Sequence, residues 1–128
     1  MAFTGSVPVM HQIGSRRRNQ PAPPHVIFEA LTQPDRDQSR PWLILLDDEQ
    51  LPVIGDTSAP EIVHWTSLWP KRPDALIRFD LPTDGGGGTD MRWTLYIETP
   101  VPDESTIGHF RKRLNVLINS KLRNTFGQ

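Results

Sequence analysis

The chain has 128 residues, and 14 Lys and Arg against 15 Asp and Glu leave a formal net charge of -1. A chain of this length removes roughly two-thirds of its unfolded surface from water on folding, so we expect a single domain over residues 1–128. The charge near zero argues against nucleic-acid binding, and the absence of cysteine excludes disulfides, thiolate metal sites and cysteine nucleophiles.

Neither a membrane span nor an export signal is predicted. No apolar stretch approaches the roughly 18 residues of a membrane-spanning helix, and the first residues lack the apolar run of a signal peptide. The triplet Arg16–Arg18 is similar to a twin-arginine signal, but the proline-rich segment 19–24 follows it where an apolar segment is required. We therefore expect a cytoplasmic protein.

The first half of the chain predicts one strand and one short helix. Apolar residues alternate between Ser6 and Ile13, which is typical of a half-buried strand. Prolines at 23 and 24 suit a first helical turn, helical spacing continues to Leu31, and Pro34 ends this helix. The apolar run Trp42–Leu46 fits a buried strand or part of a helix, because periodicity alone does not separate the two.

The second half predicts three strands. The segment Glu61–Trp69 is rich in β-branched and aromatic residues, and strict alternation predicts two further strands over 77–81 and 91–97. The glycine run Gly85–Gly88 between the last two lacks the residues of a phosphate-binding loop and predicts a hairpin connection.

The last element is a long amphipathic helix. Asp103 is the expected N-cap, and Gly127 stands where the helix should stop. Apolar residues between them recur at steps of three and four, as on the buried face of a helix. A helix over 103–126 would measure roughly 36 Å, which is long enough to cross a sheet.

The order of these elements, with the segments Pro23–Leu31, Val63–Ser67 and Gly87–Leu95, resembles the START-related helix-grip superfamily, often labelled SRPBCC, and its polyketide cyclase/dehydrase-like branch. The resemblance implies an α+β helix-grip fold, in which a curved antiparallel sheet of five to seven strands wraps around the C-terminal helix. It also implies a hydrophobic cavity. The superfamily includes lipid carriers, hormone-binding proteins, polyketide cyclases and activators of chaperone ATPases, so it implies no single reaction.

Apolar residues on the side of the sheet that faces the helix are the candidate cavity lining. They are Trp65, Phe79, Trp93, Leu95, Leu114, Leu117 and Ile118. The same stripe fits an ordinary hydrophobic core, because every sheet buries one face.

The sequence indicates no catalytic constellation and no cofactor. Histidines stand at positions 11, 25, 64 and 109, and no two have the spacing of a helical metal site. His64 alternates with apolar residues of a strand, which favours a solvated position over an acid or base in a pocket. No serine lies in a nucleophile-elbow motif, and no metal site is predicted.

Basic residues gather in two places. Arg16–Arg18 form one cluster, and the last helix carries His109, Arg111, Lys112, Arg113, Lys121 and Arg123. A solvated outer face is the default interpretation, and a contact with a protein or an anionic ligand is the alternative.

These observations predict a protein that binds a small hydrophobic molecule between the sheet and the last helix, as a monomer or a homodimer. A cyclase-like enzyme is the first alternative and would need inward-facing ionisable groups. A protein-interaction module, as in the chaperone-activator branch, is the second. It would have a filled core and an exposed apolar patch, with Trp42, Leu68 or Trp69 at the surface.

Overall fold

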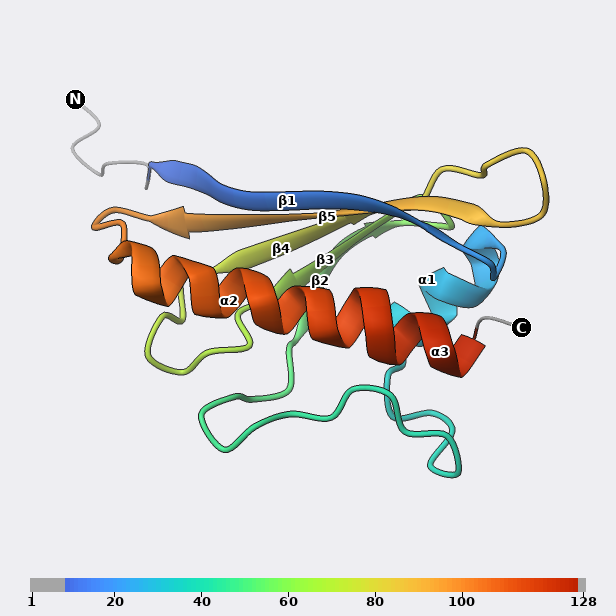
Figure 1. Cartoon of the computed structure of the whole chain (residues 1–128), viewed down its shortest axis with the longest axis horizontal. Coiled ribbons are helices and arrows are strands. Elements are labelled where there is room, and N and C mark those ends of the chain that lie inside the picture. Colours follow the sequence, from blue (N-terminus) through green and yellow to red (C-terminus); the bar gives the residue numbers. More distant parts are fainter. Residues whose placement is uncertain (1–8, 127–128) are drawn as a thin grey trace, which may run out of the picture.

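The computed structural model describes residues 9–126, in which one antiparallel sheet is covered on one face by a long C-terminal helix (Figure 1). The strands follow the order β1-β5-β4-β3-β2 across the sheet. The elements in chain order are β1 (Met10–Gln20), α1 (Pro24–Thr32), β2 (Ile54–Ser58), β3 (Ile62–Thr66), β4 (Leu76–Asp80), β5 (Thr89–Glu98), α2 (Glu104–Val116), η1 (Leu117–Leu122) and α3 (Arg123–Phe126). The predicted α+β helix-grip class is confirmed.

The last three elements form one continuous helix along the sheet (Figure 1). Asp103 is its N-cap, as predicted, because the carboxylate accepts a hydrogen bond of 2.8 Å from the backbone N–H of Thr106. The predicted stop at Gly127 lies outside the described residues. A π-helical turn, η1, interrupts the α-helix near its end. Between residues 9 and 126, the structure contains no helix with the length and hydropathy needed to cross a bilayer.

The hydrophobic core lies between this helix and rows of side chains that cross the sheet. Val63, Phe79 and Trp93 are paired across β3, β4 and β5. Directly paired residues of neighbouring strands point to the same face, so each row presents a continuous apolar strip to the helix. The alternation predicted for the strands at 77–81 and 91–97 is therefore confirmed, with observed bounds of 76–80 and 89–98.

Two predictions about strands need correction, and one strand was missed. The first strand spans Met10–Gln20 instead of Ser6–Ile13, because it pairs with β5 along its whole length, and residues 6–8 lie outside the described range. The strand predicted over Glu61–Trp69 covers only 62–66. The strand β2 was not predicted, since Gly55 and its polar neighbours give it no apolar alternation.

The segment between α1 and β2 forms a long connection beside the C-terminal helix (Figure 1). The run Trp42–Leu46 within it is neither strand nor helix. Arg113 of α2 holds this connection by donating to the backbone carbonyl of Ile44 at 3.0 Å and to the Glu49 carboxylate at 2.7 and 2.8 Å.

The glycine run forms the predicted hairpin connection between β4 and β5. Gly85 and Gly87 have φ angles of 83° and 96°, in the left-handed region that side chains disfavour. The Asp84 carboxylate accepts hydrogen bonds from the backbone N–H groups of Gly86 and Gly88 at 2.7 and 2.9 Å. These hydrogen bonds lower the pKa of Asp84, with the largest effect from the amide of Asn19.

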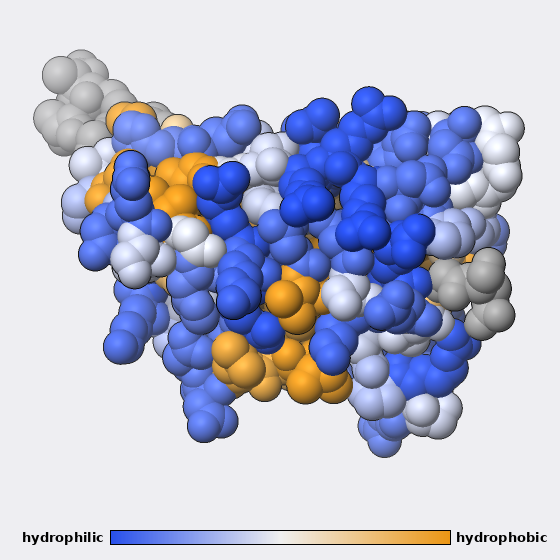
Figure 2. Space-filling model, in the orientation of Figure 1, coloured by the Kyte–Doolittle hydropathy of each residue, from blue (hydrophilic) through white to orange (hydrophobic). Residues whose placement is uncertain are grey.

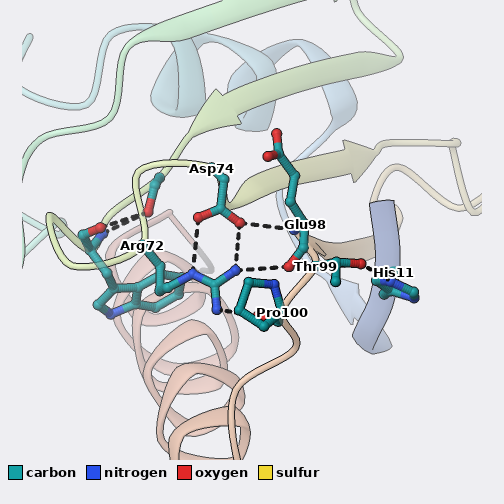
Figure 3. Close-up of polar contacts among 8 residues, drawn as sticks. His11, Arg72, Asp74, Glu98, Thr99 and Pro100 are labelled. Carbon is teal, nitrogen blue, oxygen red and sulfur yellow. Dashed lines mark hydrogen bonds and ion pairs between the residues drawn. The ribbon is translucent and has the colours of Figure 1, made fainter. Parts of the chain in front are cut away.

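A second polar network fixes the turn between β5 and α2 (Figure 3). The Arg72 guanidinium donates two hydrogen bonds to the Asp74 carboxylate, at 3.0 and 2.9 Å, and two more to the carbonyls of Glu98 and Pro100. Asp74 also accepts a bond of 2.8 Å from the N–H of Glu98. The ion pair with Arg72 lowers the pKa of Asp74. This network ties the loop before β4 to the end of β5 and to the turn that leads to the C-terminal helix.

Candidate functional site

The seven residues predicted to line a cavity all lie in the core between the sheet and the C-terminal helix. None of them exposes more than 1% of its surface, and Trp65, Phe79, Leu95, Leu114, Leu117 and Ile118 expose none. These seven residues line none of five well-formed hollows on the surface of residues 9–126. The sheet–helix interface therefore holds packed side chains at these positions.

Trp42 connects this core to the surface. Its ring stacks on Trp65 at 6.1 Å between centroids, and Trp65 meets the edge of Phe79 at 4.8 Å. The indole N–H of Trp65 donates to the carbonyl of Leu31 at 2.9 Å. The indole N–H of Trp42 is buried, yet it has no acceptor among the described residues. A buried donor without a partner costs free energy, and a bound ligand could supply the missing acceptor.

Trp42 lies at a cleft between α1, the following connection and α3. The cleft has a free volume of about 420 Å³, which is within the range of small-molecule sites. The apolar part of its lining consists of Val26, Ala30, Pro34, Trp42 and Phe126. The apolar part of the lining is suited to the apolar part of a ligand, and the buried indole N–H of Trp42 adjoins the cleft.

The polar rim of the cleft carries balanced charge. Two arginines, Arg36 and Arg40, stand against two carboxylates, Glu29 and Asp37. Arg36 pairs with Glu29, and Arg40 donates to the carbonyl of Thr125 and lies 5.4 Å from the centre of the Phe126 ring. Hydrogen bonds from Ser39 lower the pKa of Asp37, so its carboxylate is ionised at neutral pH. A rim without net charge favours a ligand of low net charge.

The best-buried carboxylate of the structure's ion pairs belongs to Glu49, whose side chain is 0% exposed. Burial alone would raise the pKa of Glu49, but hydrogen bonds from Arg113 and from the N–H of Leu46 outweigh burial and bring the pKa below its ordinary value. Glu49 is therefore ionised and paired, unlike a general acid, which needs a raised pKa.

Three ligand atoms of Asp48, Glu49 and His109 lie within 4.8 Å of one another. Both carboxylate oxygens of Glu49 already accept from Arg113, so a cation would have to compete with the guanidinium. His64, the other histidine considered for chemistry, is half-buried, and its Nδ1 lies 2.9 Å from the carbonyl oxygen of Asp56. Neither group has the surroundings of a catalytic site.

The sequence did not identify the Trp42 cleft, because Trp42 lies in a segment of undecided type. The three residues proposed as surface markers of a protein-interaction module, Trp42, Leu68 and Trp69, are all buried. Pro34 and Pro41 bound the polar segment that follows α1, but these residues do not encode where that segment packs.

The chain matches no protein-family model. It also matches none of the curated proteins. Its fold is similar to the crystal structure of CalU16 from Micromonospora echinospora, with a TM-score of 0.65 and 16% identity over 91% of this chain and 81% of that one. The comparison with the solution structure of CalU16 gives a TM-score of 0.57 and 16% identity, over 97% of this chain and 80% of that one.

The fold is also similar to the solution structure of the Aha1 dimer from Colwellia psychrerythraea. This comparison gives a TM-score of 0.62 and 18% identity over 88% of this chain and 93% of that one. At such identities the similarities show a shared helix-grip fold and carry no information on ligands.

Proposed function

We propose that this protein belongs to the SRPBCC superfamily and binds a small, mainly apolar molecule of low net charge in the Trp42 cleft. The observation that carries the proposal is a hollow of ligand size lined by Trp42, whose buried indole N–H, like that of Trp69, has no acceptor among the described residues. Burial of apolar ligand surface, at roughly 25 cal/mol per Å², would supply most of the affinity. The indole N–H would set the ligand's orientation.

The residues predicted to line a cavity lie in the core against which Trp42 packs. The ring of Trp42 stacks on Trp65, so a rotation of Trp42 would extend the cleft toward Trp65 and Phe79. Trp93, Leu95, Leu114, Leu117 and Ile118 belong to the same core. A ligand longer than the cleft would reach these residues through the position that the Trp42 ring occupies.

Binding without chemistry is favoured over a cyclase-like reaction. The resolved pKa shifts of the described carboxyl groups, at Asp37, Glu49, Asp74, Asp84 and Asp103, are all downward. Such groups are ionised and engaged in hydrogen bonds, which suits structural roles. The cytoplasmic location stays a prediction from the sequence.

A protein-interaction role is the second candidate, and one observation favours it. The connection before β2 exposes Ile44, Leu46, Leu51 and Val53, at 49%, 46%, 61% and 67% of their surface. Figure 2 shows hydrophobic atoms gathered below the C-terminal helix, where this connection lies. Exposed apolar patches on a folded domain often mark contact surfaces.

The ligand proposal is tested by filling the cleft. Val26 lines the cleft, whereas its neighbour His25 is exposed on α1 and lies outside the lining. We expect Val26→Phe to weaken binding of an apolar fluorescent dye by about tenfold or more, since the added ring occupies the ligand's space. His25→Phe adds the same group outside the cleft and should change the dissociation constant less than about twofold.

Native mass spectrometry of the protein purified from its source would then look for a retained molecule, and loss of that molecule in Val26→Phe is expected. Equal dye binding in both variants, or no dye binding and no retained molecule in the wild type, would contradict the proposal. Partner capture that is lost in Leu51→Ser but kept in Val26→Phe would support the protein-interaction role instead.

A further inference from the structure

A second hollow, on the other side of the C-terminal helix, is strongly basic. It is a groove of about 420 Å³ between β1 and α2, and its charged lining residues are Arg16, Arg18, Arg111 and Lys112. No acidic residue lines it. Figure 2 shows strongly hydrophilic side chains gathered where β1 borders the helix. The groove combines residues from the two basic clusters, which are far apart in the sequence.

The pairing of β1 with β5 explains why two arginines face the groove. Arg16 is paired with Trp93, and Arg18 is paired with Met91. Paired residues share a face, and both Trp93 and Met91 are buried against the helix side of the sheet. Because β1 is an edge strand, the side chains of Arg16 and Arg18 reach past the core to its rim.

The helix contributes the opposite wall. The side chain of Arg111 lies against Gly14 of β1. A Cβ atom at position 14 would come within 2.8 Å of the Cγ of Arg111, so the glycine permits this close approach. One turn before it, Gly108 leaves open space in the groove. The π-helical turn η1 adds the polar side chains of Asn119 and Ser120 at the far end.

The cations of the groove have no acidic partner among the described residues. The ion pairs of residues 9–126 engage other basic residues, namely Arg17, Arg36, Arg72, Arg78, His109 and Arg113. Arg17 provides the clearest contrast, because it lies between Arg16 and Arg18 but pairs with Asp90 at 3.1 Å. Four neighbouring positive charges without counter-charges repel one another, and an anion would relieve that repulsion.

We propose that this groove binds the diphosphate group of a small organic molecule. A terminal diphosphate ester carries about three negative charges at neutral pH, which the four cations of the groove can neutralise. Arginine guanidinium groups bind phosphate oxygens through paired N–H donors, and Asn115 and Ser120 add neutral donors. The proposal does not depend on the Trp42 cleft.

The lining favours a small ligand over a macromolecule or a membrane. No aromatic residue lines the groove, so it offers no surface on which bases could stack. The net charge of the chain is -1, so a long polyanion would leave the groove for a surface without net attraction. Val116 is the single large apolar residue of the lining, which is too little to insert into lipid.

The test is isothermal titration calorimetry with inorganic pyrophosphate as the probe, at low salt. We expect a dissociation constant of about 1 mM or below, which rises with salt concentration. The double variant Arg16→Gln/Arg18→Gln should weaken binding by about tenfold or more. The control Arg17→Gln removes the charge that lies between Arg16 and Arg18 in the sequence but points to the opposite face of the sheet. It should change the dissociation constant less than about twofold. Lys112→Gln provides an independent variant on the helix, and its expected loss is about threefold or more.

Removal of mutually repelling charges does not threaten the fold, and thermal melts of each variant verify this. Equal weakening by Arg17→Gln and by the double variant would overturn the proposal, as would the absence of heat with pyrophosphate up to about 10 mM. Tighter binding of a single-stranded RNA or of phosphatidylserine vesicles than of pyrophosphate would also overturn the proposal, if Arg16, Arg17 and Arg18 contribute equally to that binding.

Discussion

At the scale of single residues, the Glu49–Arg113 pair is the most consequential polar contact. The Glu49 side chain is 0% exposed and that of Arg113 is 12% exposed, so neither charge is well hydrated. Removal of one partner from such a pair leaves an uncompensated charge, which costs more than the intact pair contributes. The pair fixes the long connection to the C-terminal helix and thereby fixes one side of the molecule.

The substitution Glu49→Gln tests this contact. The pKa of Glu49 lies below its ordinary value of 4.5, so its ionised form stabilises the folded state above that pH, and this stabilisation is lost as the pH falls through the folded pKa. At pH 7 we expect the free energy of unfolding to fall by about 2–3 kcal/mol. Urea titrations at neutral and acidic pH measure the difference.

The neighbouring substitution Asp48→Asn is the control, because the side chain of Asp48 is 54% exposed and should contribute little. The gap between wild type and Glu49→Gln should narrow as the pH falls below about 4. A gap of the same size at both pH values would show that the Glu49 charge is not its cause.

The sequence predicted buried positions better than polar contacts. Parity and helical spacing indicated Phe79, Trp93 and Leu114, and all three are buried. Glu49 stands in the acidic run Asp47–Glu49, which is typical of a solvated surface, and its partner Arg113 is 64 residues further along the chain. Burial follows from a local periodicity, whereas an ion pair between distant segments depends on how those segments meet.

At the scale of elements, the turn between β5 and α2 is held by more than its own residues. Asp74 accepts from Arg72 and from the N–H of Glu98, so one carboxylate joins the loop before β4 to the end of β5 (Figure 3). The C-terminal helix begins six residues after Glu98. The position of the helix over the sheet therefore depends on this network as well as on apolar packing.

The substitution Asp74→Asn tests the contribution of the network. We expect it to lower the free energy of unfolding by about 1.5–3 kcal/mol, because it weakens charge-assisted hydrogen bonds at partly buried atoms. Asp80→Asn is a matched control, since Asp80 also pairs with an arginine two residues before it but forms no hydrogen bond with the described residues of the β5–α2 turn. Its expected cost is about 1 kcal/mol or less.

Chemical denaturation measures both values, and hydrogen exchange at the start of α2 locates the effect. We expect faster hydrogen exchange at the start of α2 in Asp74→Asn, and no change there in Asp80→Asn. Equal costs for the two variants, with unchanged exchange in α2, would show that the network does not hold the helix.

The sequence predicted β4, β5 and the long C-terminal helix, which have a regular apolar pattern, and missed β2, which lacks one. The two regular strands and the long helix were predicted within a few residues of their observed bounds. The strand β2 is mostly exposed and is held by its pairing with β3, and the extension of β1 through Arg16–Arg18 depends on pairing with β5. Such partners lie far away in the sequence, so local patterns do not reveal them.

At the scale of the whole molecule, one core cluster joins all the layers. It contains residues of α1, the long connection, β3, β4, β5 and the C-terminal helix. Tryptophans 42, 65, 69 and 93 are spread over this cluster, so their fluorescence reports on most of it. Residues of a single cluster are expected to lose their packing together.

We therefore expect unfolding in urea to be a single cooperative transition. Tryptophan fluorescence and far-ultraviolet circular dichroism should give the same midpoint within error, and the same slope. Two separated transitions would contradict the prediction of one domain over residues 1–128.

The arrangement of the strands bears on how two copies of this protein could associate. The sheet of the described residues has two free edges, β1 and β2. One edge presents consecutive exposed side chains from Arg16 to Asn19, and the other is only five residues long. Short or charged edge strands hinder the edge-to-edge pairing of sheets from different molecules, which leads to aggregation. A homodimer, if the protein forms one, is thus expected to join through loops or helices, and not by continuing the sheet from one subunit into the next.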